Sequence, residues 1–206
     1  MTKFYYRFVQ VSFHVHLNLF HQFKSEGIDN IPSEGGFILA CNHVSYLDPP
    51  LVGGSFSREI HYLARKSLFK PPILDWLLPE LNAFPIDQDR PDMSSLKKVI
   101  RLAKSGEGVL IFPEGSRSYD GEPQPAQPGI GLVLAKADVP IIPARIFGGH
   151  LAWPRDKALS LFHPVQLVIG KSFQITTPKK ASKEAYQKIG DEVMAAIRAI
   201  KPISQD

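Results

Sequence analysis

The chain has 206 residues, of which 44% are hydrophobic, so it suits one domain with a sizeable core and is too apolar to be disordered throughout. Lysine and arginine number 24 and aspartate and glutamate 20, a formal net charge of +4. This modest excess suits anionic partners such as phospholipids, phosphate esters or nucleic acid without choosing among them. The one cysteine, Cys41, excludes an intrachain disulfide and a multi-cysteine metal site, and it is compatible with a reducing compartment.

The N-terminal residues 1–24 combine aromatic side chains with few charges. The longest run without Asp, Glu, Lys or Arg, residues 8–23, is too short and too polar to span a bilayer, which takes roughly 20 mostly apolar residues. It also lacks the small-residue cleavage site of a secretory signal peptide. We therefore expect the chain to stay on the side of the membrane where it is made, and to lie on the surface of any membrane that it contacts.

We predict a helix over about residues 2–17, followed by an extended segment, although the period-two alternation of a strand also occurs here. Five apolar residues follow the helical spacing, namely Phe4, Phe8, Val11, Val15 and Leu19. Two interpretations stay open. The helix either lies in a membrane interface as an anchor or packs on the core as an ordinary terminal helix.

The rest of the chain alternates short apolar runs with helical patterns. The runs that we interpret as buried strands are residues 37–40, 109–112, 139–146 and 165–169. Prolines 140 and 143 are expected to interrupt the third of them. The helical patterns are residues 96–103, which should stop near Gly106, and residues 189–200, which should stop before Pro202. This alternation predicts an α/β fold in which helices flank a mostly parallel sheet.

Residues 42–48 directly follow the first predicted strand, and ligands of α/β proteins usually lie at such strand ends. On a continuous helix the side chains of His43 and Asp48 would point about 140° apart, so a turn is needed to bring them together. One interpretation is a histidine general base oriented by the aspartate. The other, favoured by the spacing alone, is an Asp48 that caps a helix starting at Pro49, beside an unrelated histidine.

Residues 112–118 follow the second predicted strand in the same way. Such a loop could hold a polyol phosphate, with Arg117 bound to the phosphate and Glu114 accepting a hydrogen bond from a hydroxyl. The alternative is a polar turn closed by an Arg–Glu pair. Lys66 and Arg90 are typical of solvated cations, with a phosphate contact as the other interpretation for Lys66. Cys41 could be a thiol nucleophile, but its place in an apolar strand favours a buried structural thiol.

Taken in chain order, these segments resemble four sequence blocks of the glycerolipid acyltransferases. The blocks are a His-x4-Asp signature in residues 42–48, a segment ending in Arg at 84–90, Phe-Pro-Glu-Gly-Ser-Arg-Ser at 112–118, and an apolar block at 139–144. The separation of 71 residues between His43 and Glu114 is similar to that in the short bacterial members. The resemblance extends over residues 28–175 and is strongest to the 1-acyl-glycerol-3-phosphate acyltransferases.

This resemblance implies a glycerol-phosphate acyltransferase-like fold with an amphipathic N-terminal helix. Residues 1–24 would form a membrane-surface segment ahead of an acyltransferase domain, residues 25–206. His43, oriented by Asp48, would take the proton from the free hydroxyl of a lysophospholipid. The hydroxyl oxygen would then attack the thioester of acyl-CoA or acyl carrier protein, and 1-acyl-glycerol-3-phosphate would give phosphatidic acid.

The resemblance also implies an acceptor site and a location. The residues expected to bind the glycerol phosphate are Arg90, Glu114, Gly115, Ser116, Arg117 and Lys66. No metal, cofactor or covalent acyl-enzyme is expected. The membrane surface is an expected partner, with the protein peripheral on the cytoplasmic face of the cell membrane. Nucleic acid is not an expected partner, because aromatic and basic residues do not interleave in this sequence.

Three alternatives to this function stay open. The acceptor could be another lysophospholipid or a lyso-aminolipid. The chain could be a lipid-binding protein that keeps the fold without the activity, although a binder has no need of the base that His43 and Asp48 would form. Water could be the acceptor in a hydrolase, although the absence of a Gly-x-Ser-x-Gly elbow argues against a serine hydrolase.

Overall fold

The computed structural model describes residues 4–87, 93–177 and 182–204. The strands are β1 (Lys24–Glu26), β2 (Phe37–Cys41), β3 (Ile60–Arg65), β4 (Ala83–Ile86), β5 (Gly108–Ile111), β6 (Ile141–Phe147) and β7 (Gln166–Ile169). The helices are α1 (Phe4–His21), α2 (Asp48–Gly54), α3 (Pro72–Glu80), α4 (Met93–Lys104), α5 (Ile130–Ala137), α6 (Gly149–Ala152) and α7 (Lys183–Ala199), with the 3-10 turns η1 (Ile28–Asn30) and η2 (Lys66–Phe69).

The seven strands form one sheet in the order β1-β7-β6-β2-β5-β3-β4. The neighbouring strands are parallel, except that β6 and β7 run antiparallel. The prediction of an α/β fold with a mostly parallel sheet is therefore confirmed. Because β2, β5 and β6 are parallel neighbours, the loops that follow them meet at one edge of the sheet.

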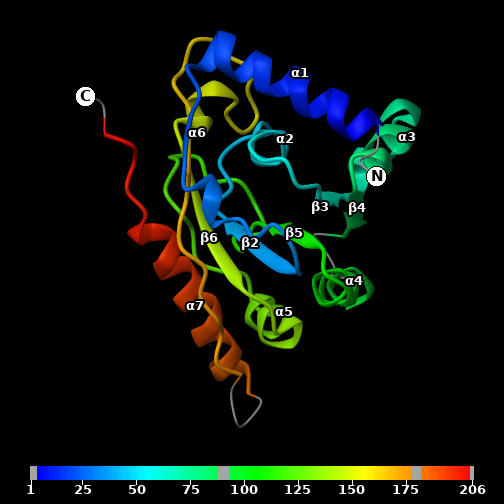
Figure 1. Ribbon diagram of the computed structural model, residues 1–206, viewed down its shortest axis with the longest axis vertical. Helices are drawn as coiled ribbons and strands as arrows, with labels where there is room; N and C mark the ends of the chain where they lie inside the picture. The colour runs from blue at the N-terminus through cyan, green and yellow to red at the C-terminus, as the bar shows by residue number, and fades with distance from the viewer. Residues whose placement is uncertain (1–3, 88–92, 178–181, 205–206) are drawn as a thin grey trace.

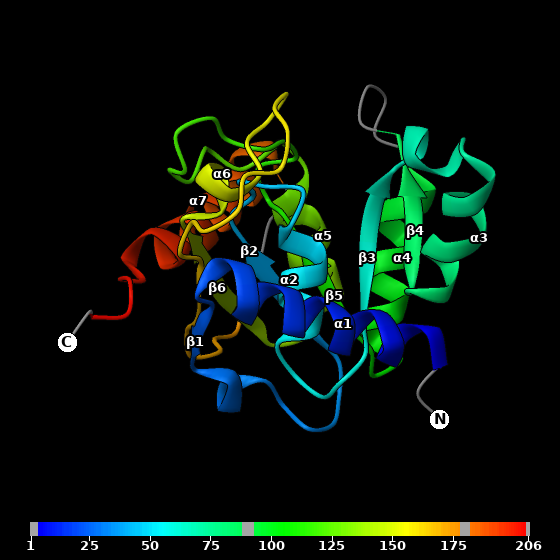
Figure 2. The same ribbon diagram turned by 90° about the horizontal axis from the view of Figure 1, so that it is seen from above.

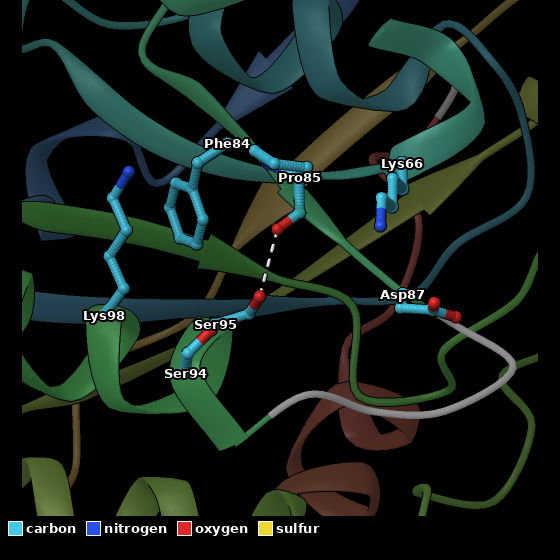
Figure 3. Close-up of a pocket in the computed structure, with 7 residues that line it drawn as sticks. All are labelled: Lys66, Phe84, Pro85, Asp87, Ser94, Ser95 and Lys98. Carbon is cyan, nitrogen blue, oxygen red and sulfur yellow. Dashed lines mark hydrogen bonds between the residues drawn. The ribbon is translucent and has the colours of Figure 1, made fainter. Parts of the chain in front are cut away.

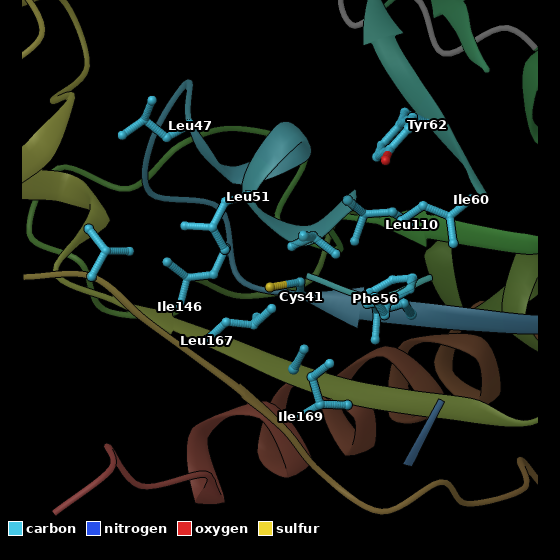
Figure 4. Packing of buried hydrophobic residues seen from close by; sticks show 14 of the residues in the cluster. Cys41, Leu47, Leu51, Phe56, Ile60, Tyr62, Leu110, Ile146, Leu167 and Ile169 are labelled. Carbon is cyan, nitrogen blue, oxygen red and sulfur yellow. The ribbon is translucent and has the colours of Figure 1, made fainter. Parts of the chain in front are cut away.

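Helices cover both faces of the sheet (Figures 1 and 2). Helices α1 and α2 lie on one face, and α4, α5 and α7 lie on the other. Strand β2 supplies both layers because its side chains alternate: Leu39 and Cys41 pack in the first cluster, and Ile38 and Ala40 in the second. Figure 4 shows the first cluster around the Cys41 side chain. Strand β2 therefore lies buried on both faces and supports the loop that follows it.

Several boundaries differ from the sequence predictions. Strands β1, β3 and β4 were not predicted, and β6 begins at Ile141 and continues through Pro143 to Phe147, so the expected interruption is wrong. The Pro143 carbonyl still accepts a hydrogen bond from Gly170 N at 2.8 Å, so the strand loses only one N–H donor. The division between residues 24 and 25 falls inside β1, which begins at Lys24.

Helix α1 is longer than predicted and shows its apolar stripe to solvent. It runs from Phe4 to His21, so the extended segment expected after residue 17 is helical. The five apolar residues at helical spacing are Phe4, Phe8, Val11, Val15 and Leu19, and they are 49–74% exposed. The buried residues of α1 are instead Tyr6, Gln10, Leu17 and His21. No described helix is long and apolar enough to cross a membrane.

Hydrogen bonds join the buried face of α1 to the rest of the fold. The hydroxyls of Tyr6 and Tyr62 lie 2.9 Å apart in the core. The Gln10 side-chain amide donates to the carbonyl oxygens of Gly53, at 2.7 Å, and Phe56, at 2.6 Å. Polar groups can be buried here because they find partners on α2, on β3 and in the segment between them. Helix α1 is therefore part of the domain core on one side and an exposed apolar surface on the other.

Replacing Gln10 tests this attachment. The Gln10→Leu variant keeps the side-chain volume but leaves two buried carbonyl oxygens without their donor. The free energy of unfolding should fall by about 1–3 kcal/mol, measured by urea denaturation. The control is Asn18→Ala, because Asn18 is exposed and bonds only to the backbone of α1 among the described residues. Equal effects of the two changes would contradict the role of Gln10.

Candidate active site

The loop after β2 brings His43 and Asp48 together. The distance between His43 Nδ1 and Asp48 Oδ2 is 2.7 Å. The same Asp48 oxygen accepts hydrogen bonds from Val44 N at 2.6 Å and Ser45 N at 2.8 Å. These bonds close a tight turn over the segment between the two side chains. The turn explains how residues five positions apart can meet, and it favours the interpretation of a paired His and Asp.

Asp48 does not cap α2 in the way that the spacing alone suggested. Helix α2 begins at Asp48 itself, and the preceding Leu47 occupies the N-cap position without a side-chain hydrogen bond. The Asp48 carboxylate instead turns back toward the chain that precedes it. The N-cap prediction is therefore wrong: the carboxylate accepts from the amides of Val44 and Ser45, and the next two residues, Pro49 and Pro50, have no N–H to donate.

The pair has a definite proton arrangement. Asp48 is 0% exposed, and its Oδ2 accepts from two backbone amides. An oxygen that accepts from amides is best matched by a donating Nδ1–H, which leaves His43 Nε2 as the nitrogen with a lone pair. The His43 side chain is 18% exposed, and within the described ranges no hydrogen bond engages Nε2. The arrangement therefore presents an accessible base.

The loop after β5 holds the His43 backbone and ring. His43 N donates to Glu114 Oε1 at 2.9 Å, and Ser118 N donates to the His43 carbonyl oxygen at 2.8 Å. The Phe112 ring stacks on the imidazole, with centroids 4.0 Å apart and planes 14° apart. These contacts bring the loops after β2 and β5 together at His43.

Glu114 is a buried acid with two hydrogen-bond donors. It is 1% exposed, and its second oxygen, Oε2, accepts from Gln124 N at 2.9 Å. Burial raises the pKa of Glu114 from 4.5 to about 7, and the nearby Asp48 acts in the same direction, against the two amide hydrogen bonds and the more distant Arg198. Part of the Glu114 population is therefore protonated near neutral pH.

Arg117 lies over the turn that joins His43 to Asp48. Its guanidinium carbon is 3.4 Å from the centroid of the Tyr46 ring. One terminal nitrogen, Nη1, is buried and has no hydrogen-bond partner among the residues that the structure describes. The preceding Gly115 has a φ of 69°, and a Cβ there would approach Gln127 Cγ to 2.7 Å. Glycine is thus favoured at position 115 of this loop.

The remaining predicted site residues are Ser116, Arg90 and Lys66. Ser116 is exposed. Arg90 falls outside the described residues. Lys66 follows β3 and lines a pocket of about 440 Å³ between the end of β4 and the start of α4, which Figure 3 shows with its lining side chains. The residues that line this pocket are Lys66, Phe84, Pro85, Asp87, Ser94, Ser95 and Lys98. The described pocket hence carries two cations, Lys66 and Lys98, and one carboxylate, Asp87.

No role was predicted from the sequence for three residues that surround the His43–Asp48 pair. Asn42 joins β2 to β6: its side-chain amide donates to Ile146 O, and its carbonyl oxygen accepts from Ile146 N, at 3.0 and 2.7 Å. Phe112 stacks on His43, and Tyr46 contacts Arg117. All three lie inside the two polar segments, and their partners become visible when the strands are placed side by side.

Glu114→Gln removes the titration at this buried position. Because the pKa of Glu114 is raised, its contribution to stability is present below pH 4.5 and is lost as the pH rises through about 7. The free energy of unfolding of the wild type, relative to the variant, should therefore fall by about 3 kcal/mol from acid to alkaline pH. Urea titrations at a series of pH values measure this difference. A difference that stays constant with pH would contradict the raised pKa.

Known proteins resemble this chain in sequence. The family model described as Acyltransferase matches residues 22–147. The 1-acyl-sn-glycerol-3-phosphate acyltransferase of Bacillus subtilis (strain 168) is 35% identical over 144 residues, which are 69% of this chain and 71% of the relative. A chloroplastic 1-acyl-sn-glycerol-3-phosphate acyltransferase of Brassica napus, BAT2, is 26% identical over 93% of this chain, which spans 56% of that relative.

A solved structure agrees with the sequence comparisons. The crystal structure of the 1-acyl-sn-glycerophosphate acyltransferase from Thermotoga maritima superposes with a TM-score of 0.72. It is 25% identical, and the match covers 96% of this chain and 81% of that one. The family match includes the His43, Asp48 and Glu114 positions. The resemblance noted from the four sequence blocks is confirmed, and the chain belongs to the acyltransferase family.

Proposed function

We propose that this protein transfers an acyl group from a thioester donor to the free hydroxyl of a lysophospholipid. The proposed acceptor is 1-acyl-sn-glycerol-3-phosphate, and the product is phosphatidic acid. Relatives from Bacillus subtilis and Brassica napus have this acceptor in their names. The donor is acyl-CoA or acyl carrier protein, both of which present a thioester. The observation on which the proposal rests most is the buried Asp48 bonded to an accessible His43.

The chemistry follows from the proton arrangement of this pair. His43 Nε2 takes the proton of the acceptor hydroxyl as its oxygen bonds to the thioester carbonyl carbon. The carbon–sulfur bond then breaks, and the imidazolium returns the proton to the leaving thiolate, which departs as a thiol. Asp48 stabilises the imidazolium through Nδ1 and fixes the tautomer. These reaction steps need no metal or cofactor, because an activated thioester and a positioned base suffice.

The acceptor phosphate needs a cationic site close to the base. Arg117 is the first candidate, because it lies over the His43–Asp48 turn and its buried Nη1 lacks a partner within the described part of the chain. A buried guanidinium nitrogen is stabilised when an anion accepts its hydrogen bond. Lys66, Arg90, Gly115 and Ser116 remain proposed contacts of the same acceptor.

The assay that tests the proposal measures thiol release and lipid products together. With acyl-CoA or acyl carrier protein and 1-acyl-glycerol-3-phosphate, the wild type should release thiol only when acceptor is present and should form phosphatidic acid. His43→Ala should lower the rate by about 10²- to 10⁴-fold, because the general base is lost. The control is His61→Ala, because His61 lies on β3 away from the loops.

Each other result has a defined meaning for the proposal. Thiol release without acceptor would indicate hydrolysis. No release with either donor would direct the test to a panel of other lysophospholipids and lyso-aminolipids. Binding of lipid without any transfer across that panel would indicate a lipid-binding protein and would overturn the proposal.

We also propose that the enzyme meets its acceptor on the surface of a membrane, peripherally and on the cytoplasmic face. The exposed stripe of α1 continues onto α3, where Ile73 is 77% and Trp76 54% exposed. The Tyr5 and Trp76 rings are in edge contact, with centroids 5.0 Å apart, and Figures 1 and 2 both show the start of α1 beside α3. An apolar surface rich in aromatic residues suits the interface of a lipid bilayer.

Substitutions on this surface test the membrane proposal without removing α1 from the core. Phe8→Ser combined with Trp76→Ser should lower binding to phosphatidylglycerol–phosphatidylcholine vesicles at least tenfold, because burying one aromatic side chain contributes about 1.5–3 kcal/mol. Vesicle sedimentation measures the bound fraction. Met93→Ser is the matched control, because Met93 is 52% exposed at the start of α4, on the other side of the sheet. Unchanged binding of the double variant, or an equal loss in the control, would contradict the proposal.

A further inference from the structure

Both carboxylate oxygens of Glu114 are engaged by the protein itself. Oε1 lies 2.9 Å from His43 N, and Oε2 lies 2.9 Å from Gln124 N. Each donor is a backbone amide from a different loop. Glu114 is 1% exposed, so an acceptor hydroxyl has almost no surface of this residue to contact. The geometry differs from the role that the family resemblance implies for Glu114, which is a contact with the glycerol phosphate.

The Glu114 bond lies just beyond the point where the sheet ladder ends. The last paired residues of β2 and β5 are Ala40 and Ile111. Past this point the regular pairing of β2 with β5 no longer joins the two segments. Glu114 accepts from His43 N on one side, and Ser118 N donates to the His43 carbonyl on the other. The His43 backbone is thereby bonded at both of its polar groups to a single loop.

The same loop is bonded to the segment that follows it. Gln127 N donates to Pro113 O at 2.8 Å, and Gln127 Nε2 donates to Glu114 O at 3.1 Å. With the Gln124 bond, these contacts hold Glu114 in place from the far side. A buried carboxylate that accepts from two fixed amides restricts the position of both of them. Displacement of His43 by about 1 Å would be enough to lower the rate strongly.

We propose that Glu114 is a positioning residue: its carboxylate joins the His43 amide to the loop after β5 and thereby sets the place of the imidazole, without contacting the acceptor. This inference rests on the proposed function, in which His43 is the general base. It distinguishes two possible roles of Glu114. A ligand of the acceptor affects acceptor binding, whereas a positioning residue affects the turnover of an acceptor that still binds.

Glu114→Gln is the informative variant. The amide keeps the size but has one acceptor oxygen, so one backbone amide would face an NH₂ group. We expect kcat to fall about 100-fold, while the dissociation constant of a short-chain lysophosphatidic acid, measured without donor, changes less than twofold. The matched control is Glu122→Gln in the same loop, because Glu122 is exposed, its side chain is 70% accessible, and its ion pair is with Arg145. This control should behave like the wild type.

A spectroscopic measurement reports on His43 without any substrate. The Nδ1 proton shared with Asp48 should give a downfield NMR resonance, assigned by its absence in His43→Ala. In Glu114→Gln this resonance should shift or broaden, while in Glu122→Gln it should stay unchanged. This reading remains valid even if the wild type transfers no acyl group, so failure of the proposed function and failure of this inference can be told apart.

Two results would overturn the inference. A tenfold or larger weakening of acceptor binding with an unchanged His43 resonance would make Glu114 a ligand of the acceptor. An unchanged kcat together with an unchanged His43 resonance would show that Glu114 does not position His43. If the Gln variant does not fold, Glu114→Asp keeps the charge but is too short to span both amides. It should then show the altered resonance with unchanged acceptor binding, and an unaltered resonance would refute the proposal.

Discussion

The Asp48 carboxylate is the group on which the site depends. One of its oxygens accepts from the amides of Val44 and Ser45 and contacts His43 Nδ1. Those bonds create the turn, bring the imidazole to the carboxylate, and leave the second ring nitrogen toward the solvent. A fully buried carboxylate would be unfavourable without such partners, so the same bonds that form the base also make the burial of Asp48 possible.

Parallel pairing of β2, β5 and β6 explains why several loops converge on this turn. The three strands end at one edge of the sheet. The segments that follow β5 and β6 each contact the loop that follows β2. The β5 loop supplies Phe112, Glu114 and Ser118 to His43. The segment after β6 supplies the Trp153 carbonyl oxygen, which accepts from Ser45 Oγ at 3.1 Å. The sheet thus provides rigid spacing, and the loops convert that spacing into an oriented side chain.

Helix α1 packs against the fold with one face and leaves the other face exposed. Tyr6 and Gln10 face inward, where Tyr62, Gly53 and Phe56 offer hydrogen-bond partners. The apolar stripe of α1 is consequently left outside, where it continues onto α3. The two interpretations of this helix, anchor and packed terminal helix, therefore do not exclude each other, because they concern its opposite faces.

The sequence by itself determined the α/β class, the main buried strands, and the segments that contain His43, Asp48, Glu114 and Arg117. Apolar runs and strand-end polar clusters are local signals, so they can be recognised without coordinates. Only the tertiary structure decided that Asp48 turns back to His43, that Glu114 bonds to two backbone amides, and which face of α1 is buried. Each of these depends on partners from other elements: hydrogen-bond donors and acceptors on neighbouring loops decide where a polar side chain points, and no local pattern contains them.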